Sequence, residues 1–332
     1  MRKVSLTGIK PTGSLHIGNY LGAIKPALEL AKEFDARYFI ADYHGLNTIK
    51  DPKELNFTIR HVAAGWLAAG LDPERVLLYR QSSIPEIFEL TVMLMAFTSK
   101  GLMNRAHAYK AAVQVNADKG DDLDAGVNMG LFTYPVLMAA DIIAFDSDVV
   151  PVGQDQVQHI EMAQDIAGAV NANYKKPVLK VPKAAIQDSV ATVAGLDGRK
   201  MSKSYNNAIE LFCSEAVLQK TIMRMVTNSQ GVEEPKDPDS SHIFSLYKFF
   251  ADQGEQDALA ARYRAGGMGW GVAKEELFRV TNRALSPMRE RYEAIIADIP
   301  ALDKILEQGA EKARPIAAAT IKRLRKACGI DS

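Results

Sequence analysis

The sequence predicts an α/β fold, with a doubly wound parallel sheet over residues 1–204 and an all-helical domain over residues 205–332. Strand-like and helix-like stretches alternate up to about residue 195. Alternation of this kind places a parallel sheet between two layers of helices. From about residue 205 the strand pattern ends and helical periods continue. A chain of 332 residues is long enough for one large and one smaller domain.

The alternating elements follow in order along the first half of the chain. The expected strands are short apolar runs: Val4–Ile9, Tyr38–Ala41 and Val76–Tyr79. The expected helices carry apolar residues at helical spacing: Leu21–Phe34, Pro52–Ala69 and Glu86–Leu102. Pro52 suits the first turn of its helix, where an N–H would have no partner. Ligands of parallel sheets bind beyond the carboxyl ends of the strands, so we expect a site after Ile9.

Composition excludes several classes of protein. The net charge is zero, so no global field draws the chain to nucleic acid or to a membrane. Cys213 and Cys328 form no CxxC pair, which argues against a disulfide scaffold and against a zinc or iron–sulfur site. The most apolar window, residues 130–145, contains Pro135 and Asp141 and is too short to span a bilayer. From the cysteine pattern we expect no protein-bound metal. Without a charged leader or membrane span, we expect a cytoplasmic protein.

The first strand leads into the stretch "PTGSLHIGNY", residues 11–20. Pro11 favours a turn, Gly13 permits close approach of a ligand, and Thr12 and backbone N–H groups would meet a phosphate. His16 could donate to phosphoryl oxygens, and Gly18 leaves room for a flat base. The alternative is a tight turn in which the histidine only caps a helix.

A second stretch, "GLDGRKMSKSYNN" at residues 195–207, presents two lysines and two serines on a loop. Lys200 and Lys203 alternate with Ser202 and Ser204. Ammonium and hydroxyl donors in this arrangement suit a multiply charged phosphate group. The alternative is a solvated basic loop without a ligand.

His16-Ile17-Gly18-Asn19 followed about 180 residues later by "KMSKS" resembles the class I aminoacyl-tRNA synthetases. The resemblance implies a Rossmann-like catalytic domain, ATP with Mg²⁺, and activation of an amino acid before its transfer to tRNA. In that chemistry charge builds up on phosphoryl oxygens, so catalysis depends on positioning and electrostatic stabilisation. The resemblance implies catalytic roles for His16, Lys200 and Lys203.

A third stretch, "TYPVLMAADI" at residues 133–142, distinguishes the members of that class. In a helix that starts at Pro135, Tyr134, Met138 and Asp141 lie within about 60° of one another around the axis. A carboxylate on this face could accept a bond from the indole N–H of tryptophan, which has no acceptor of its own. The alternative is that Asp141 is the structural partner of a nearby cation.

This string and the following "VPVGQDQVQH" resemble the tryptophanyl-tRNA synthetase family, and the similarity covers nearly the whole chain. The family implies that Asp141 binds the indole N–H between Met138 and Val152. It implies that Tyr134 and Gln156 bind the α-ammonium, with His44 near the amino acid. The tryptophan-binding residues implied are therefore Asp141, Met138, Tyr134, Gln156, His44 and Val152.

The same resemblance implies an ATP site drawn from three parts of the chain. Its residues are Lys10, Pro11, Thr12, Gly18, Asn19, Gly153, Gln154, Asp155, Val193, Lys200, Met201, Ser202, Lys203 and Ser204. Lys10 departs from the family pattern, because many bacterial relatives carry glutamine there. A lysine could pair with the tryptophan carboxylate, with phosphate, or with neither.

By resemblance, residues 205–332 bind the anticodon of tRNA, and their last helix could pack back on the catalytic domain. That helix is basic, which suits phosphates but equally suits a solvated face. The family also implies a homodimer through the region near residues 85–130. Four alternatives stay open: an auxiliary paralogue with altered discrimination, a tyrosyl enzyme, a small-molecule nucleotidyltransferase, and a non-enzymatic paralogue.

Overall fold

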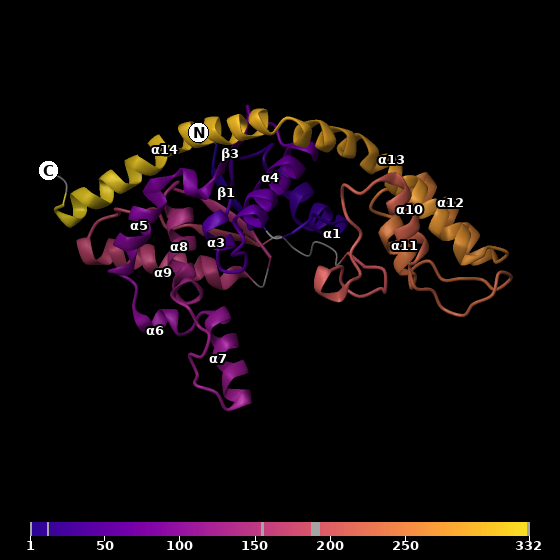
Figure 1. The fold of residues 1–332 in the computed structure, drawn as a ribbon, viewed down its shortest axis with the longest axis horizontal. Helices are drawn as coiled ribbons and strands as arrows, with labels where there is room; N and C mark the ends of the chain where they lie inside the picture. Colours follow the sequence, from indigo (N-terminus) through magenta and orange to yellow (C-terminus); the bar gives the residue numbers. More distant parts are fainter. Residues whose placement is uncertain (1, 12, 154–155, 187–192, 331–332) are drawn as a thin grey trace.

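The computed structural model describes residues 2–11, 13–153, 156–186 and 193–330 (Figure 1). Within them one parallel sheet has the strand order β3-β2-β1-β4-β5. Its strands are β1 (Val4–Ile9), β2 (Asp35–Ile40), β3 (Leu77–Arg80), β4 (Val149–Val152) and β5 (Lys183–Ile186). The order reverses direction between β1 and β4, and sheets of this kind bind ligands at that switch point. The predicted α/β fold is confirmed.

Alternate residues of β2 face two hydrophobic cores. Tyr38 and Ile40 pack with α4, while Phe39 packs with α5, α8 and α9. The helices on the sheet are α1 (Ile17–Asn19), α2 (Lys25–Leu30), α3 (Asp42–Gly45), α4 (Pro52–Ala68), α5 (Pro85–Met95), α6 (Lys100–Met103), α7 (His107–Lys119), α8 (Met129–Ile143) and α9 (Val157–Tyr174). Both faces of the sheet are thus covered, and α7 projects away from it (Figure 1).

The second half is helical in the part that the structure describes from residue 205 onward. Its helices are α10 (Glu215–Met223), α11 (His242–Tyr247), α12 (Gln253–Ala265), α13 (Trp270–Ala297) and α14 (Ile299–Cys328). The helices α10 to α12 gather at one end of the molecule, and α13 and α14 form a long arc back over the sheet (Figure 1). In the described ranges, no helix has both the length and the apolarity needed to cross a membrane.

Helix α14 is packed tightly against β3. A Cβ on residue 309 would lie 1.9 Å from the carbonyl oxygen of Leu78, so only glycine permits this approach. Asp303 pairs with Arg60 of α4 at 2.6 Å and with Arg80 of β3 at 2.5 Å. Farther along α14, three arginines of the helix form ion pairs: Arg314 with Glu86, Arg323 with Asp146 and Arg325 with Glu89. Part of its basic character therefore serves contact with the sheet domain.

Two predicted helices begin elsewhere. The first begins at Ile17 rather than Leu21, because His16 caps it, and it continues as a π-helical segment, Tyr20–Ile24, into α2. Helix α8 begins at Met129 rather than Pro135, because the Asn128 side chain accepts a bond from the N–H of Leu131 at 2.9 Å. Pro135 therefore lies inside α8, and the spacing of the residues after it is unchanged.

Candidate active site

Hydrogen bonds join the turn after β1 to the lysine-bearing loop and to the segment that follows it. Ile17 N–H donates to the Ile209 carbonyl at 2.9 Å, and Leu211 N–H donates to the Leu15 carbonyl at 2.9 Å. The Met201 thioether accepts a bond from Gly18 N–H at 3.2 Å. The turn after β1 and the loop of residues 200–204 therefore form one surface.

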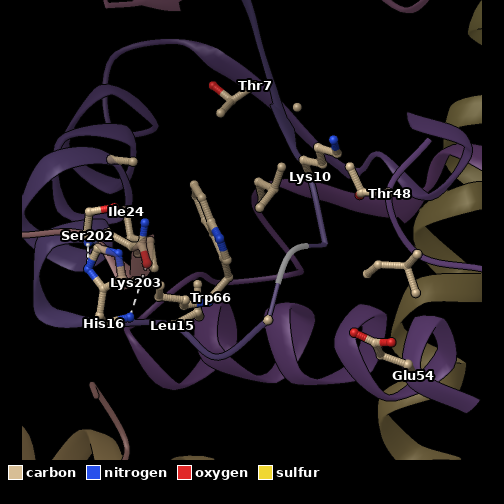
Figure 2. A pocket seen from close by; sticks show the side chains of 16 residues that line it. Thr7, Lys10, Leu15, His16, Ile24, Thr48, Glu54, Trp66, Ser202 and Lys203 are labelled. Carbon is tan, nitrogen blue, oxygen red and sulfur yellow. Dashed lines mark hydrogen bonds between the residues drawn. The ribbon is translucent and has the colours of Figure 1, made fainter. Parts of the chain in front are cut away.

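Two cavities lie along this surface. The larger, of about 680 Å³, extends from the end of β1 to the lysine-bearing loop. Figure 2 shows His16, Ser202 and Lys203 on one side of it and Lys10 on the other, with the Trp66 ring between them. The second, of about 480 Å³, shares His16, Asn19 and Ser202 with the first. It also contains Gly18, Val193, Lys200, Met201 and Ser204 from the predicted ATP set.

His16 has a defined tautomer because it caps α1. Its Nδ1 accepts a bond from Asn19 N–H at 3.2 Å, while the Asn19 side chain accepts from His16 N–H at 3.1 Å. Burial and the nearby Lys203 charge lower the pKa of His16 to about 4. The ring is thus neutral near pH 7, with its proton on Nε2. The capping role is observed, and it leaves Nε2–H as a donor for an anion.

Lys203 reaches back across the cavity to the first turn. Gly13 has φ +55°, and a Cβ there would lie 2.7 Å from the Lys203 Nζ. Desolvation lowers the pKa values of both Lys203 and Lys10. Cations in such surroundings gain from an anionic ligand that replaces the lost water.

Asn207 holds the lysine-bearing loop in shape and was not expected from the sequence. Its Oδ1 accepts from Ser202 N–H at 2.8 Å, and its Nδ2 donates to Asp197 at 2.6 Å and to the Lys200 carbonyl at 3.2 Å. This bond and the ion pair with Arg199 lower the pKa of Asp197 to about 2. The sequence signal for Asn207 was its place at the end of the stretch of residues 195–207; its burial is visible only in the structure.

Some predicted ATP residues lie beside these cavities or outside the described ranges. Pro11 is buried against Gly45 at the end of α3. Gly153 is exposed after β4, and its carbonyl accepts from Gln156 N–H at 2.9 Å. Thr12, Gln154 and Asp155 lie outside the described residues.

The predicted tryptophan site centres on a buried carboxylate. Asp141 is 1% exposed, and its Oδ2 lies 3.0 Å from the Nε2 of His44. Gln81, which no sequence pattern singled out, donates from Nε2 to both Asp141 oxygens at 2.8 Å. Burial raises the pKa of Asp141, and the bonds from His44 and Gln81 oppose this shift. Asp141 therefore has His44 and Gln81 as hydrogen-bond partners in the folded chain.

Aromatic rings connect this carboxylate to the start of α9. The ring of Tyr134 lies edge-on to His44 at 6.3 Å and to His159 at 5.4 Å between centroids. Met138 and Val152 pack against the hydrophobic core of the same face of the sheet. Gln156 is exposed just before α9, three residues ahead of His159. The structure thus gathers His44, Tyr134 and Asp141, with the other three predicted residues on the adjoining elements.

Residues 2–286 match the family model described as tRNA synthetases class I (W and Y). A tryptophan–tRNA ligase of Pseudomonas aeruginosa is 51% identical over 331 residues, which are 98% of this chain and 74% of that protein. The chain belongs to the tryptophan–tRNA ligases of the class I tRNA synthetases.

Two further relatives align with this synthetase over almost the whole length of both chains. The tryptophan–tRNA ligase of Neisseria meningitidis is 47% identical over 332 residues, 99% of this chain and 98% of that protein. A crystal structure of the Campylobacter jejuni tryptophanyl-tRNA synthetase, complexed with ADP and tryptophan, has a TM-score of 0.91 and 41% identity. It covers 98% of this synthetase and 99% of that chain.

Proposed function

We propose that this synthetase joins L-tryptophan to its tRNA in two steps. The tryptophan carboxylate attacks the α-phosphorus of ATP, the bond to the β-phosphate oxygen breaks, and pyrophosphate leaves. A ribose hydroxyl at the 3′ end of the tRNA then attacks the acyl carbon, and AMP leaves with the bonding electrons. The observation that supports the proposal is a cavity lined by Lys10, His16 and Lys203 beyond the end of β1, together with the buried Asp141 carboxylate on α8.

The residues of the larger cavity fit a triphosphate. Lys203 and Lys10 supply positive charge, and the neutral ring of His16 supplies an uncharged Nε2–H donor. Lys200 faces the adjoining cavity, where Val193 and Met201 are buried and suit the adenine. Since charge grows on phosphoryl oxygens in the transition state, donors fixed beforehand lower the barrier. Mg²⁺ is proposed to enter as the ATP complex.

The amino-acid site would select by hydrogen bonding in a dry environment. Asp141 accepts the indole N–H, Met138 and Val152 lie against the ring, and Tyr134 and Gln156 hold the α-ammonium. His44 already touches Asp141 and would fix its orientation. A site of this kind rejects an analogue without the N–H, because the buried acceptor then loses its partner.

Residues 205–332 are assigned to anticodon binding, and the enzyme would work in the cytoplasm, where tRNA is charged for protein synthesis. A second copy of the chain is proposed to cover an apolar stripe on α5. Phe88, Val92 and Met95 share one face at helical spacing and are 64%, 53% and 41% exposed. In sedimentation experiments Phe88→Glu should convert dimers to monomers, while Val272→Glu on α13 should not. A dimer unaffected by Phe88→Glu would remove this face from the interface.

Amino-acid-dependent exchange of pyrophosphate into ATP tests the assignment and its rivals. We expect exchange with tryptophan and none with tyrosine at equal concentration. Exchange with tyrosine alone would identify a tyrosyl enzyme, and tryptophan exchange without transfer to the tRNA would indicate a paralogue. A chain inactive with both amino acids would be a binding protein or another nucleotidyltransferase.

A further inference from the structure

We propose that Gln81 is a positioning residue for tryptophan: it holds the Asp141 carboxylate so that one oxygen stays open to the indole N–H. This inference rests on the proposed role of Asp141 as the indole acceptor. It concerns a residue that the tryptophan set derived from the sequence does not include.

The amide of Gln81 has a single orientation. Gln81 begins a short 3₁₀ turn, Gln81–Ser83, directly after β3 and is completely buried. Its Oε1 accepts a bond from Tyr43 N–H at 3.1 Å, so the opposite end, Nε2, must face Asp141. Nε2 then lies 2.8 Å from both carboxylate oxygens. A flipped amide would place Nε2 against the Tyr43 N–H and Oε1 against the Asp141 carboxylate, so it is excluded.

The two oxygens of Asp141 are not equivalent in this arrangement. Among the residues that the structure describes, Oδ2 has two partners, His44 and Gln81, whereas Oδ1 has Gln81 alone. A carboxylate oxygen accepts about two hydrogen bonds. We therefore assign the indole N–H to Oδ1, and Gln81 sets the angle at which that oxygen is presented.

Gln81 also favours the form of Asp141 that can only accept. A protonated carboxyl would bring a second donor to the indole N–H. Burial and the neighbouring Asp42 oppose ionisation of Asp141, whereas His44 favours it. The buried Tyr79 is a further titratable group that interacts with Asp141. Gln81 contributes a donor that carries no charge, so its support does not change with pH.

The variant Gln81→Met removes the donor and keeps a side chain of similar length. Tyr43 N–H retains Asp42 Oδ1 at 3.1 Å as a partner, which protects the local backbone. Binding by equilibrium dialysis should be measured for tryptophan and for β-(benzothiophen-3-yl)alanine, which has sulfur in place of the N–H. We expect Kd for tryptophan to rise about tenfold, while Kd for the analogue stays within about twofold. Equal losses for both would mean that Gln81 only packs the pocket, and no change in either would also overturn the proposal.

A second variant, Gln81→Glu, gives a signature that packing cannot produce. Two carboxyl groups this close share one proton at low pH, and the introduced carboxyl can then donate to Asp141 as the amide does. At higher pH the proton leaves, and two adjacent anions repel each other. We expect KM for tryptophan to be near that of the wild type at acidic pH and to rise with pH, whereas Gln81→Met is impaired at every pH. A pH-independent KM in Gln81→Glu would contradict the positioning role.

Two controls separate this inference from the function on which it rests. Asp141→Asn should weaken tryptophan binding; if it does not, the proposed indole acceptor is wrong and Gln81 has nothing to position. If Asp141→Asn weakens binding and Gln81→Met does not, only the inference fails. Gln164→Met, on α9, removes a comparable bond from Gln164 Nε2 to the Pro182 carbonyl and should leave both Kd values unchanged.

Discussion

The proposed nucleotide half and the proposed tryptophan half of the site are built in opposite ways. The nucleotide half lies on turns and loops, and Lys200 and Lys203 are exposed. The tryptophan half lies on α8, α3 and the turn after β3, and Asp141 and Gln81 are almost fully excluded from solvent. Exposed lysine side chains can shift with the phosphates as charge builds up on the phosphoryl oxygens during the reaction. A buried and already bonded carboxylate can distinguish one aromatic amino acid from another, because every unpaired group there costs free energy.

The largest expected effect concerns the nucleotide half. Lys203→Ala and Lys200→Ala should each lower kcat for adenylate formation by about 10²–10³, by analogy with the loss of one oxyanion donor. Tryptophan affinity without ATP should barely change, because the described partners of Asp141 are His44 and Gln81 and include neither lysine. Single-turnover kinetics and equilibrium dialysis measure the two quantities, with Lys220→Ala on α10 as a surface control. Tryptophan affinity lost in step with the rate would make the loop structural.

A smaller effect is expected in the tryptophan half. Asp141→Ala leaves the indole N–H unpaired in a dry pocket, and a buried bond to a charged group contributes about 1.5–3 kcal/mol. The kcat/KM for tryptophan should therefore fall about 10–150-fold, with less change in KM for ATP. Steady-state pyrophosphate exchange checks this, and an unaltered kcat/KM for tryptophan would refute the assignment.

His16 links the nucleotide half to the pH dependence of stability. Its pKa is lowered from 6.5 to about 4 in the folded chain, so the unfolded chain binds more protons between these values. The free energy of unfolding should therefore fall as the pH drops from about 6.5 to about 4. His16→Asn preserves the helix cap and removes the titrating ring, so it should flatten this part of the profile. Urea denaturation at several pH values tests the slope, and identical slopes in both proteins would contradict the buried neutral ring.

The smallest effect is expected for Lys10, which lines the larger cavity on the side opposite Lys203 (Figure 2). If it pairs with the tryptophan carboxylate in the ground state, it binds substrate without favouring the transition state. Lys10→Gln should raise KM for tryptophan several-fold and leave kcat within about threefold, since an exposed ion pair contributes about 0–1 kcal/mol. A drop in kcat beyond about tenfold with unchanged KM would place Lys10 among the groups that act on the α-phosphate.

Sequence alone predicted the elements whose pattern is local. The apolar run Val4–Ile9 forms β1 with the same bounds, and the spacing from Tyr134 to Asp141 holds although α8 begins six residues earlier than Pro135. The first helix was placed too late, because the cap formed by His16 and Asn19 depends on side-chain geometry rather than on periodicity.

Contacts between distant parts of the chain escaped prediction. Gln81 gains its role from a carboxylate 60 residues away, and its only local signal is its place at the carboxyl end of a strand. The basic residues of α14 suited phosphate binding and a solvated face equally well. In the structure Arg323 and Arg325 instead pair with acids 177 and 236 residues away. Partners at such separation leave no periodicity in the sequence.

The most direct test of two separately built halves is a double-mutant cycle between Asp141→Ala and Lys203→Ala, measured as kcat/KM for tryptophan in pyrophosphate exchange. The two side chains share no partner among the hydrogen bonds around Asp141 and the contact of Lys203 with the first turn. Independent sites add within about 0.5 kcal/mol. The account therefore predicts that the loss in the double variant equals the product of the two single losses. A double variant no worse than the poorer single variant would show that the two halves act as one unit, and would contradict the account.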